Sequence, residues 1–137
     1  MTIHEAILAA DEPAVRQILE SGTGALSTIA EAGGYRGVAP LHLAVKGEPL
    51  NMVTLLVEKG ADLEAVDLDH EASPLGWAAF FGNAEMARHL IELGADVNHQ
   101  CKPMMIAESG HKGEWRDYAS VPPEQYEAVM AVLREHG

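Results

Sequence analysis

The residue types best suited to metal chemistry lie close together in the C-terminal third of the chain. His99, Cys101 and His111 provide two imidazoles and one thiol, and Glu108 adds a carboxylate. Zinc takes nitrogen and sulfur ligands of this kind at regular spacings. The spacing here matches no standard zinc motif. We therefore expect no metal and no cofactor. A small metal-binding protein or an enzyme that uses Cys101 and His111 is an alternative.

Nucleophilic chemistry has little support in the sequence. Cys101 would need a base and an electropositive setting to become a thiolate, and Lys102 and His99 are near it only in sequence. The chain has neither a Gly-x-x-x-x-Gly-Lys-Ser/Thr phosphate loop nor a Gly-x-Ser-x-Gly nucleophile elbow. The His-Glu pairs that begin at His4 and His70 lack the second histidine of a zinc helix. We expect that the protein is not an enzyme.

The elements that position these residues form a repeat. Residues 39–45 (Ala-Pro-Leu-His-Leu-Ala-Val) return as residues 73–79 (Ser-Pro-Leu-Gly-Trp-Ala-Ala), and residues 56–64 return as residues 90–98. Both offsets are 73 − 39 = 90 − 56 = 34 residues. With weaker copies at either end, the copies span approximately residues 1–33, 39–72, 73–101 and 102–137. A fixed period of this length indicates stacked supersecondary units.

Each copy is predicted to contain two short helices. Pro40 and Pro74 suit the first turn of a helix, where the missing N–H would have no partner. The second helix carries an apolar stripe at three-and-four spacing and ends at Gly60 or Gly94, where a left-handed cap favours glycine. One such pair cannot bury its apolar face alone, so the copies must stack and share a core.

The two central copies resemble the ankyrin-repeat family, whose pattern is Thr-Pro-Leu-His-x-Ala-Ala, a second helix, and then Gly-Ala-Asp-Val-Asn. The resemblance implies an all-α ankyrin-repeat solenoid of stacked helix-turn-helix units with projecting turns, or fingers, and a concave surface lined by the first helices. It also implies that His42 braces successive fingers. Ala39 lacks the family's hydroxyl and Gly76 lacks its imidazole, so neither central copy keeps the full pair. We expect one domain over residues 1–137, with a lengthened connection at 23–38 and an insertion at 111–123.

The same resemblance implies where a partner would bind. Trp77 occupies the position of Glu5 in the first copy, which predicts that this position is not fully buried. Exposed aromatic side chains are common binding anchors. The alternative is that the aromatic side chains pack inward as core. The candidate contacts are Tyr35, Arg36, Asp69, His70 and Glu71 on the fingers, Lys46, Trp77, Phe80 and Phe81 on the first helices, and Trp115 in the insertion.

The insertion itself has two interpretations. It mixes Trp115 and Tyr118 with charges of both signs, as a recognition loop would. Alternatively, these two rings fold back and cover the open C-terminal end of the stack.

Composition narrows the class of partner. The 9 basic and 21 acidic residues give a net charge of −12, so nucleic acid and anionic membrane surfaces would be repelled. No apolar run is long enough to span a bilayer, we expect no secretory signal, and the single cysteine favours a reducing cytoplasm. We expect a monomeric, non-catalytic module that binds another protein. A sharper version of this expectation is an acidic neutralising protein, immunity- or antitoxin-like, for a basic partner. A purely structural or oligomeric role is a third class of function, beside the binding module and the metal-binding protein or enzyme.

Overall fold

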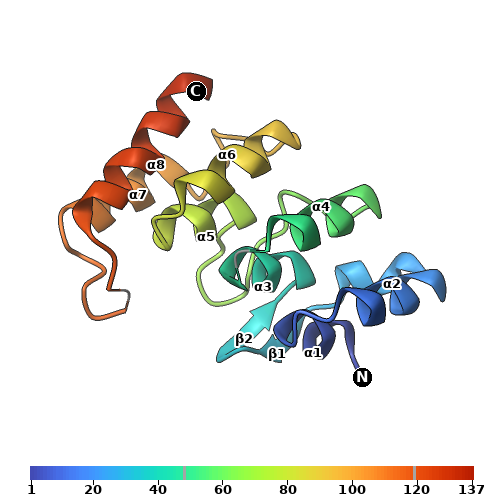
Figure 1. The fold of residues 1–137 in the computed structure, drawn as a ribbon. Helices are drawn as coiled ribbons and strands as arrows, with labels where there is room; N and C mark the ends of the chain where they lie inside the picture. The colour runs from blue at the N-terminus through green and yellow to red at the C-terminus, as the bar shows by residue number, and fades with distance from the viewer. Residues whose placement is uncertain (48, 119) are drawn as a thin grey trace.

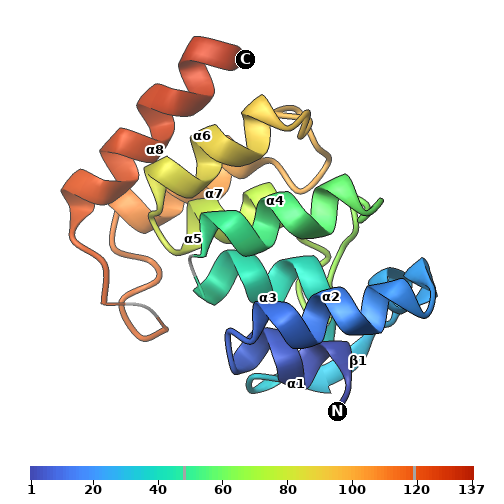
Figure 2. The same cartoon turned by 45° about the vertical axis from the view of Figure 1, so that its right-hand side comes forward.

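The computed structural model describes residues 1–47, 49–118 and 120–137, and these form four helix pairs stacked side by side (Figures 1 and 2). Residue 119 of the predicted insertion lies outside the described residues. The helices are α1 (Ile3–Leu8), α2 (Glu12–Glu20), α3 (Pro40–Gly47), α4 (Leu50–Glu58), α5 (Pro74–Phe80), α6 (Ala84–Glu92), α7 (Pro103–His111) and α8 (Pro123–His136). The prediction of a helical stack is confirmed.

Local sequence signals begin and end these helices where the repeat predicts. Ser73 caps α5 by accepting a hydrogen bond from the Gly76 N–H at 3.2 Å, and Pro74 follows at the first position. Gly60 follows α4 with φ of 105° and Gly94 follows α6 with φ of 113°. Both φ values lie in the region that L side chains rarely adopt, so the predicted glycine stops are confirmed.

The core runs continuously through the stack. Ala44, Ala78 and Ala79 are fully buried on α3 and α5, where small side chains let neighbouring helices approach closely. Leu56 and Leu90 fill the matching positions of α4 and α6. Burial of such side chains contributes about 25 cal/mol per Å² of apolar area, so shared packing rather than helix propensity holds these short helices.

The lengthened connection between the first two copies contains regular structure that the sequence analysis did not predict. It forms a 3₁₀ helix, η1 (Thr23–Ser27), and a hairpin of β1 (Ala30–Ala32) and β2 (Tyr35–Val38). The strands are antiparallel, with Ala32 opposite Tyr35. Gly33 and Gly34 form the turn with φ of 61° and 88°. Two adjacent glycines between short apolar runs favour a hairpin turn of this kind.

Two imidazoles tie successive pairs together. His4 Nε2 bonds the Val38 carbonyl oxygen at 2.9 Å, and His42 Nε2 bonds the Ala72 carbonyl oxygen at 2.9 Å. The predicted bracing role of His42 is thus confirmed. The equivalent residue of α5 is Gly76, and a Cβ there would lie 3.0 Å from the Cys101 sulfur. The thiol therefore fills the space that the absent imidazole leaves.

The long helix α8 closes the C-terminal end of the stack. Its Tyr126 ring packs over Gly110 of α7, and the Tyr126 hydroxyl donates a 2.7 Å hydrogen bond to the Phe80 carbonyl oxygen of α5. Exposed positions on α8 include Glu124, Glu127, Arg134 and Glu135, which give it the polar outer face of a capping repeat. None of the described helices has the length and apolar character needed to cross a membrane.

Candidate functional site

The first helices present one common face, which we call the first-helix face. It is defined by two rows of equivalent positions: Glu5, Leu43, Trp77 and Ile106, and three residues later Leu8, Lys46, Phe80 and Ser109. Glu5, Leu8 and Lys46 are exposed, whereas Leu43 and Trp77 retain only 2% and 4% of their accessible surface. Equivalent positions in the repeat therefore differ sharply in exposure.

The expectation that Trp77 is an exposed anchor is wrong. Its ring lies 4.7 Å from the Tyr35 ring of the hairpin and 4.9 Å from the His42 imidazole. Its indole N–H donates a 3.0 Å hydrogen bond to Asp67 Oδ1. A side chain that is buried against two rings and satisfied at its polar atom cannot contact a partner without a local opening.

Asp67 organises the finger loop, residues 65–72, around a buried carboxylate. Oδ1 accepts from the Ala72 N–H at 3.0 Å as well as from Trp77, and Oδ2 accepts from the backbone and ring nitrogens of His70, both at 2.9 Å. Burial alone raises the pKa of the carboxyl group, but these four donors outweigh it and hold the pKa of Asp67 below its ordinary value. The loop thus favours the ionised form of Asp67.

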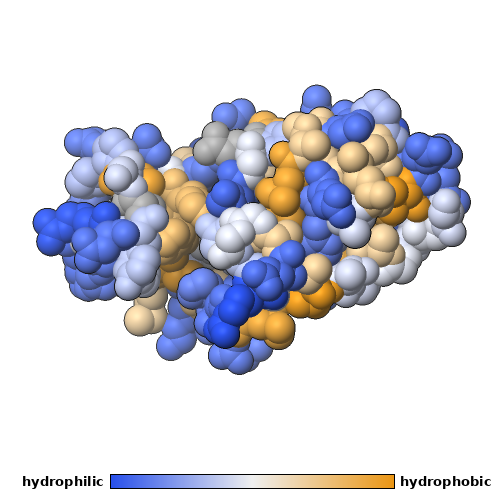
Figure 3. Space-filling view, turned by 90° about the horizontal axis from the view of Figure 1, so that it is seen from below, coloured by the Kyte–Doolittle hydropathy of each residue, from blue (hydrophilic) through white to orange (hydrophobic). Residues whose placement is uncertain are grey.

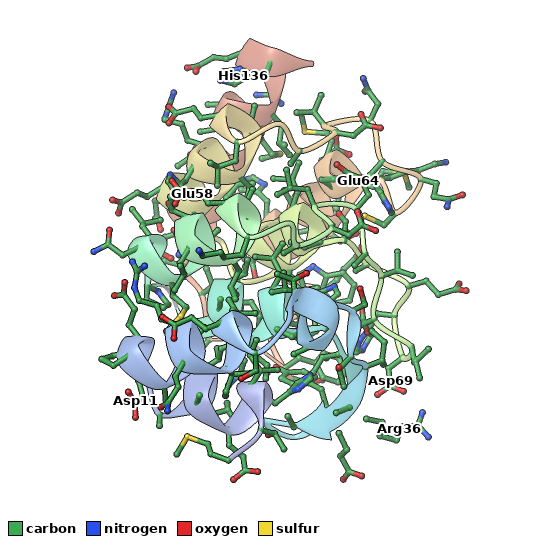
Figure 4. The ribbon with its side chains drawn as sticks, turned by 90° about the vertical axis from the view of Figure 1, so that its right-hand side faces the viewer. Asp11, Arg36, Glu58, Glu64, Asp69 and His136 are labelled. Atoms are coloured by element: carbon green, nitrogen blue, oxygen red, sulfur yellow. The ribbon has the colours of Figure 1, made fainter. Side chains whose placement is uncertain are left out.

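The candidate finger residues lie together at one edge of the molecule. The Arg36 guanidinium donates to Asp69 Oδ1 at 2.9 Å, and Figure 4 shows this pair beside the hairpin. That hydrogen bond holds the pKa of the Asp69 carboxyl below its ordinary value. The His70 side chain is 63% exposed, and Glu71 is exposed with φ of 52°. Arg36 and Asp69 largely neutralise each other, whereas the exposed part of the His70 ring and the Glu71 carboxylate can contact a partner.

Aromatic rings connect the hairpin to the insertion across the first-helix face. Trp77 meets Phe81 at 6.1 Å between ring centroids, Phe81 meets Phe80 at 5.1 Å, and Phe80 meets Trp115 at 5.3 Å. At the other end, the Lys46 ammonium lies 5.8 Å from the centroid of the Tyr35 ring. Burial, followed by the nearby Asp67 charge, raises the pKa of Tyr35. Tyr35, Phe80, Phe81 and Trp115 are each half-buried. We call the row of rings from Tyr35 through Trp77, Phe81 and Phe80 to Trp115 the aromatic strip, and it is partly open to solvent.

The two aromatic residues of the insertion behave differently. Trp115 folds back: its indole N–H donates a 2.9 Å hydrogen bond to the Ile106 carbonyl oxygen, and its ring covers Phe80. Tyr118 remains 76% exposed. Trp115 thus folds back, but onto the first-helix face and not over the end of the stack, which α8 closes, and Tyr118 does not fold back.

An open hollow of about 400 Å³ lies where the α5–α6 turn meets α4 and α8. Leu50, Phe81 and Gln125 line it on three sides. On the face that carries the hairpin, Figure 3 shows apolar patches interrupted by polar side chains. A surface of this mixed kind suits contact with another macromolecule better than enclosure of a small ligand.

Comparison with known proteins assigns the family. A family model described as "Ankyrin repeats (3 copies)" matches residues 3–112. The chain belongs to the ankyrin-repeat family. Ankyrin repeats are generally protein–protein interaction modules and are typically non-catalytic.

The relatives of this ankyrin-repeat chain are much longer proteins. It is 37% identical over 86 residues to "B-cell lymphoma 3 protein homolog" of Mus musculus, an alignment that covers 63% of this chain and 19% of that protein. It is 41% identical over 66 residues to "Ankyrin repeat and SAM domain-containing protein 6" of Rattus norvegicus, covering 48% and 8%. With "Nuclear factor NF-kappa-B p100 subunit" of Gallus gallus the identity is 38% over 65 residues, covering 47% and 7%. The chain thus spans less than a fifth of these relatives.

His99, Cys101, Glu108 and His111 do not form a cluster in this ankyrin-repeat stack. His111 Nε2 lies 2.8 Å from Glu127 Oε1 on α8, and His99 Nδ1 accepts a 3.0 Å hydrogen bond from the Cys101 backbone N–H. Within residues 1–47, 49–118 and 120–137, no three His, Cys, Asp or Glu side chains are grouped to hold a metal ion.

Two features of this site were not predicted from the sequence. Asp67 was only one of several acidic residues in a turn, and its ten-residue separation from Trp77 gives no signal of a hydrogen bond. The cover over Leu43 was missed because the hairpin was not predicted. The Gly33-Gly34 pair was the available signal for it.

Proposed function

We propose that this chain binds a partner protein through the open part of the first-helix face and the neighbouring finger loop. The observation that carries the proposal is the aromatic strip from Tyr35 to Trp115, in which every ring except the buried Trp77 is half-buried and which lies beside the charged finger. Its rings are already held by one another and by the helices. Little conformational entropy is therefore lost on docking, which favours binding. The role proposed is binding without catalysis.

Charge suggests the character of the partner. The net charge is −12, and among the described residues Arg16, Arg36 and Arg88 are engaged in ion pairs with acidic side chains. Exposed carboxylates at Asp62 and Glu71 remain on the finger side. A basic partner surface would be attracted at long range, with an association rate that falls as salt rises. This includes the neutralising role as a special case.

The apolar contribution is tested by quantitative affinity purification with three baits: wild type, Phe80→Ala and Ile91→Ala. Phe80 and Ile91 are both half-buried and apolar, but Ile91 lies on the second helix α6. A protein retained by wild type and Ile91→Ala but lost by Phe80→Ala supports binding at the first-helix face. Equal retention by all three baits contradicts it.

The charge contribution is tested with the purified partner by comparing Glu71→Lys with the matched reversal Glu85→Lys on α6. Both glutamates are exposed. A basic partner predicts that only Glu71→Lys slows association, and that raising salt weakens wild-type binding. Salt-insensitive association with no loss in Glu71→Lys would leave the aromatic strip as the binding determinant and refute a basic partner.

A further inference from the structure

The β1–β2 hairpin lies on the first-helix face of its own chain. A Cβ at Gly33 would lie 3.1 Å from Leu43 Cδ2 and 3.3 Å from Leu8 Cδ2, so the turn passes directly over α3 and α1. Two residues later the Tyr35 ring sits against Trp77 of α5 and under the Lys46 ammonium. Glu5, which occupies the same row as Leu43 and Trp77, is exposed. The hairpin therefore buries Leu43 and Trp77, although the equivalent position in the first copy is exposed to solvent.

We propose that the hairpin is a built-in occupant of this face, and that the surface beneath it binds an extended partner segment with the same chemistry. That segment carries small residues, then an aromatic residue, then a basic residue, as Gly33-Gly34-Tyr35-Arg36 does here. This inference rests on the proposed protein-binding function. It adds the kind of segment that the partner presents and the opening of the hairpin that exposes the surface for that segment.

Each part of the hairpin identifies the receptor group that a partner would use. Leu43 and Leu8 approach the turn closely, and Gly33 has φ of 61°, so a glycine is favoured at this position. Trp77 and Lys46 both contact one aromatic ring: the Trp77 ring packs against it at a tilt of 54°, and the Lys46 ammonium lies 5.8 Å from its centroid. Asp69 accepts from the basic side chain that follows. Charge complementarity therefore favours a basic rather than an acidic residue at this end.

The hairpin is suited to leave without unfolding the helices. Its strands have 3 and 4 residues, and an isolated two-stranded hairpin of this size is marginally stable. On its N-terminal side Leu26 of η1 is buried in the core, and residues 27–29, which lead into β1, are exposed. At its other end the Gly37 carbonyl oxygen accepts a 2.8 Å hydrogen bond from the Leu68 N–H, and Val38 is buried. The hairpin is therefore anchored at Leu26 and at Val38, and local opening of the residues between these two anchors costs less than global unfolding.

The test uses the full chain and a synthetic peptide with the sequence of residues 29–38, fluorescently labelled. Tyr35→Ala removes the ring that holds the hairpin down, and Tyr118→Ala, which removes an exposed ring elsewhere, is the matched control. If the face is self-occupied, the peptide binds Tyr35→Ala roughly tenfold or more tightly than wild type or Tyr118→Ala, because the competing closed state is depopulated. A peptide with Ala in place of its tyrosine should not bind. Equal affinity for all three proteins, or equal binding of both peptides, overturns the proposal.

Two further measurements keep the result decisive. If circular dichroism shows that Tyr35→Ala is unfolded, hydrogen exchange of the wild type replaces it: amides of residues 30–37 must exchange faster than those of α3 and α5, and equal rates overturn the proposal. The Phe80→Ala purification reports on the first-helix face independently of the hairpin. Loss of the partner there with no peptide binding removes only the inference about the hairpin, whereas retention there removes the proposed function itself.

Discussion

The indole N–H of Trp77 on α5 donates a 3.0 Å hydrogen bond to Oδ1 of Asp67, and both side chains are buried. Asp67 also receives both nitrogens of His70 and the Ala72 N–H. One carboxylate therefore joins the finger loop to the first helix of the next pair. A ring that supplies one of four donors to a buried charge is a structural element of the fold.

Replacing Trp77 with Phe should lower the free energy of unfolding by about 1.5 to 3 kcal/mol, since hydrogen bonds to charged groups lie in this range. Phenylalanine also has the smaller ring, so lost packing at this buried site adds to the loss from the missing N–H. Urea unfolding monitored by circular dichroism measures the change. Phe81→Leu, which alters the same aromatic strip without a polar atom, is the control. A Trp77→Phe protein as stable as wild type would show that the hydrogen bond adds nothing.

Acidification should destabilise the stack through His42. The Nδ1 atom accepts from the Ala39 N–H at 3.2 Å, so the Nε2–H donates to Ala72, and the ring is held neutral. Burial lowers the pKa of His42 against the opposing effect of the Ala72 hydrogen bond. The unfolded chain then binds the proton more readily, and stability falls as the pH drops below the unfolded value of about 6.5.

The checking measurement for His42 compares melting temperatures at several pH values between roughly 7.5 and 5.5. His42→Gln keeps one amide donor and one acceptor but does not titrate. It should start from a lower melting temperature and lose less of it on acidification than wild type. Parallel curves for the two proteins would rule out His42 as the titrating group.

Ala10→Gly should stabilise the protein by about 0.5 to 1 kcal/mol. Ala10 follows α1 with φ of 54°, and its N–H bonds the Ile7 carbonyl oxygen. The equivalent position after α5 is Gly82, with φ of 65°. Glycine removes the steric cost of this conformation at residue 10. Ala9→Gly, one residue earlier with φ of −82°, should instead destabilise the fold, and chemical denaturation of both variants compares the two signs.

Gly110→Ala should destabilise the protein by about 1 to 3 kcal/mol, although alanine is the better helix former. A Cβ at residue 110 would clash with the ring of Tyr126, whose hydroxyl is fixed on Phe80. The neighbouring substitution Ser109→Ala gives the propensity gain without the clash and should leave stability unchanged or slightly raised. Thermal unfolding of the pair separates the two effects, and a stabilised Gly110→Ala would mean that α8 is not docked in this way.

The repeat made much of the fold predictable because its signals are local. Proline at the helix starts, Gly60 and Gly94 at the helix ends, and the apolar stripe between them each act within one copy. The bracing role of His42 also followed from the family pattern. The hairpin was missed because it lies in the one connection that departs from the repeat.

The candidate site was less predictable because burial depends on contacts between distant segments. Trp77 was expected to resemble Glu5, but Tyr35 from the hairpin covers Trp77, whereas Glu5 is exposed. Likewise, the charge of Arg36 could be read from the sequence, whereas its pairing with Asp69 could not. An insertion changes the surroundings of neighbouring copies, and the pattern of a single copy does not record this.

The thiol in the place of an imidazole makes residues 76 and 101 epistatic. The Cys101 sulfur would lie 3.0 Å from a Cβ at residue 76, so it crowds any side chain placed there. Ser73 Oγ lies 3.4 Å from the same sulfur. A reversion of Gly76 to the histidine usual in this family would meet that sulfur unless Cys101 had first become smaller. Loss of the thiol alone would in turn leave a void against Gly76. The order in which mutations arise at these two sites therefore decides which descendants of this chain can fold.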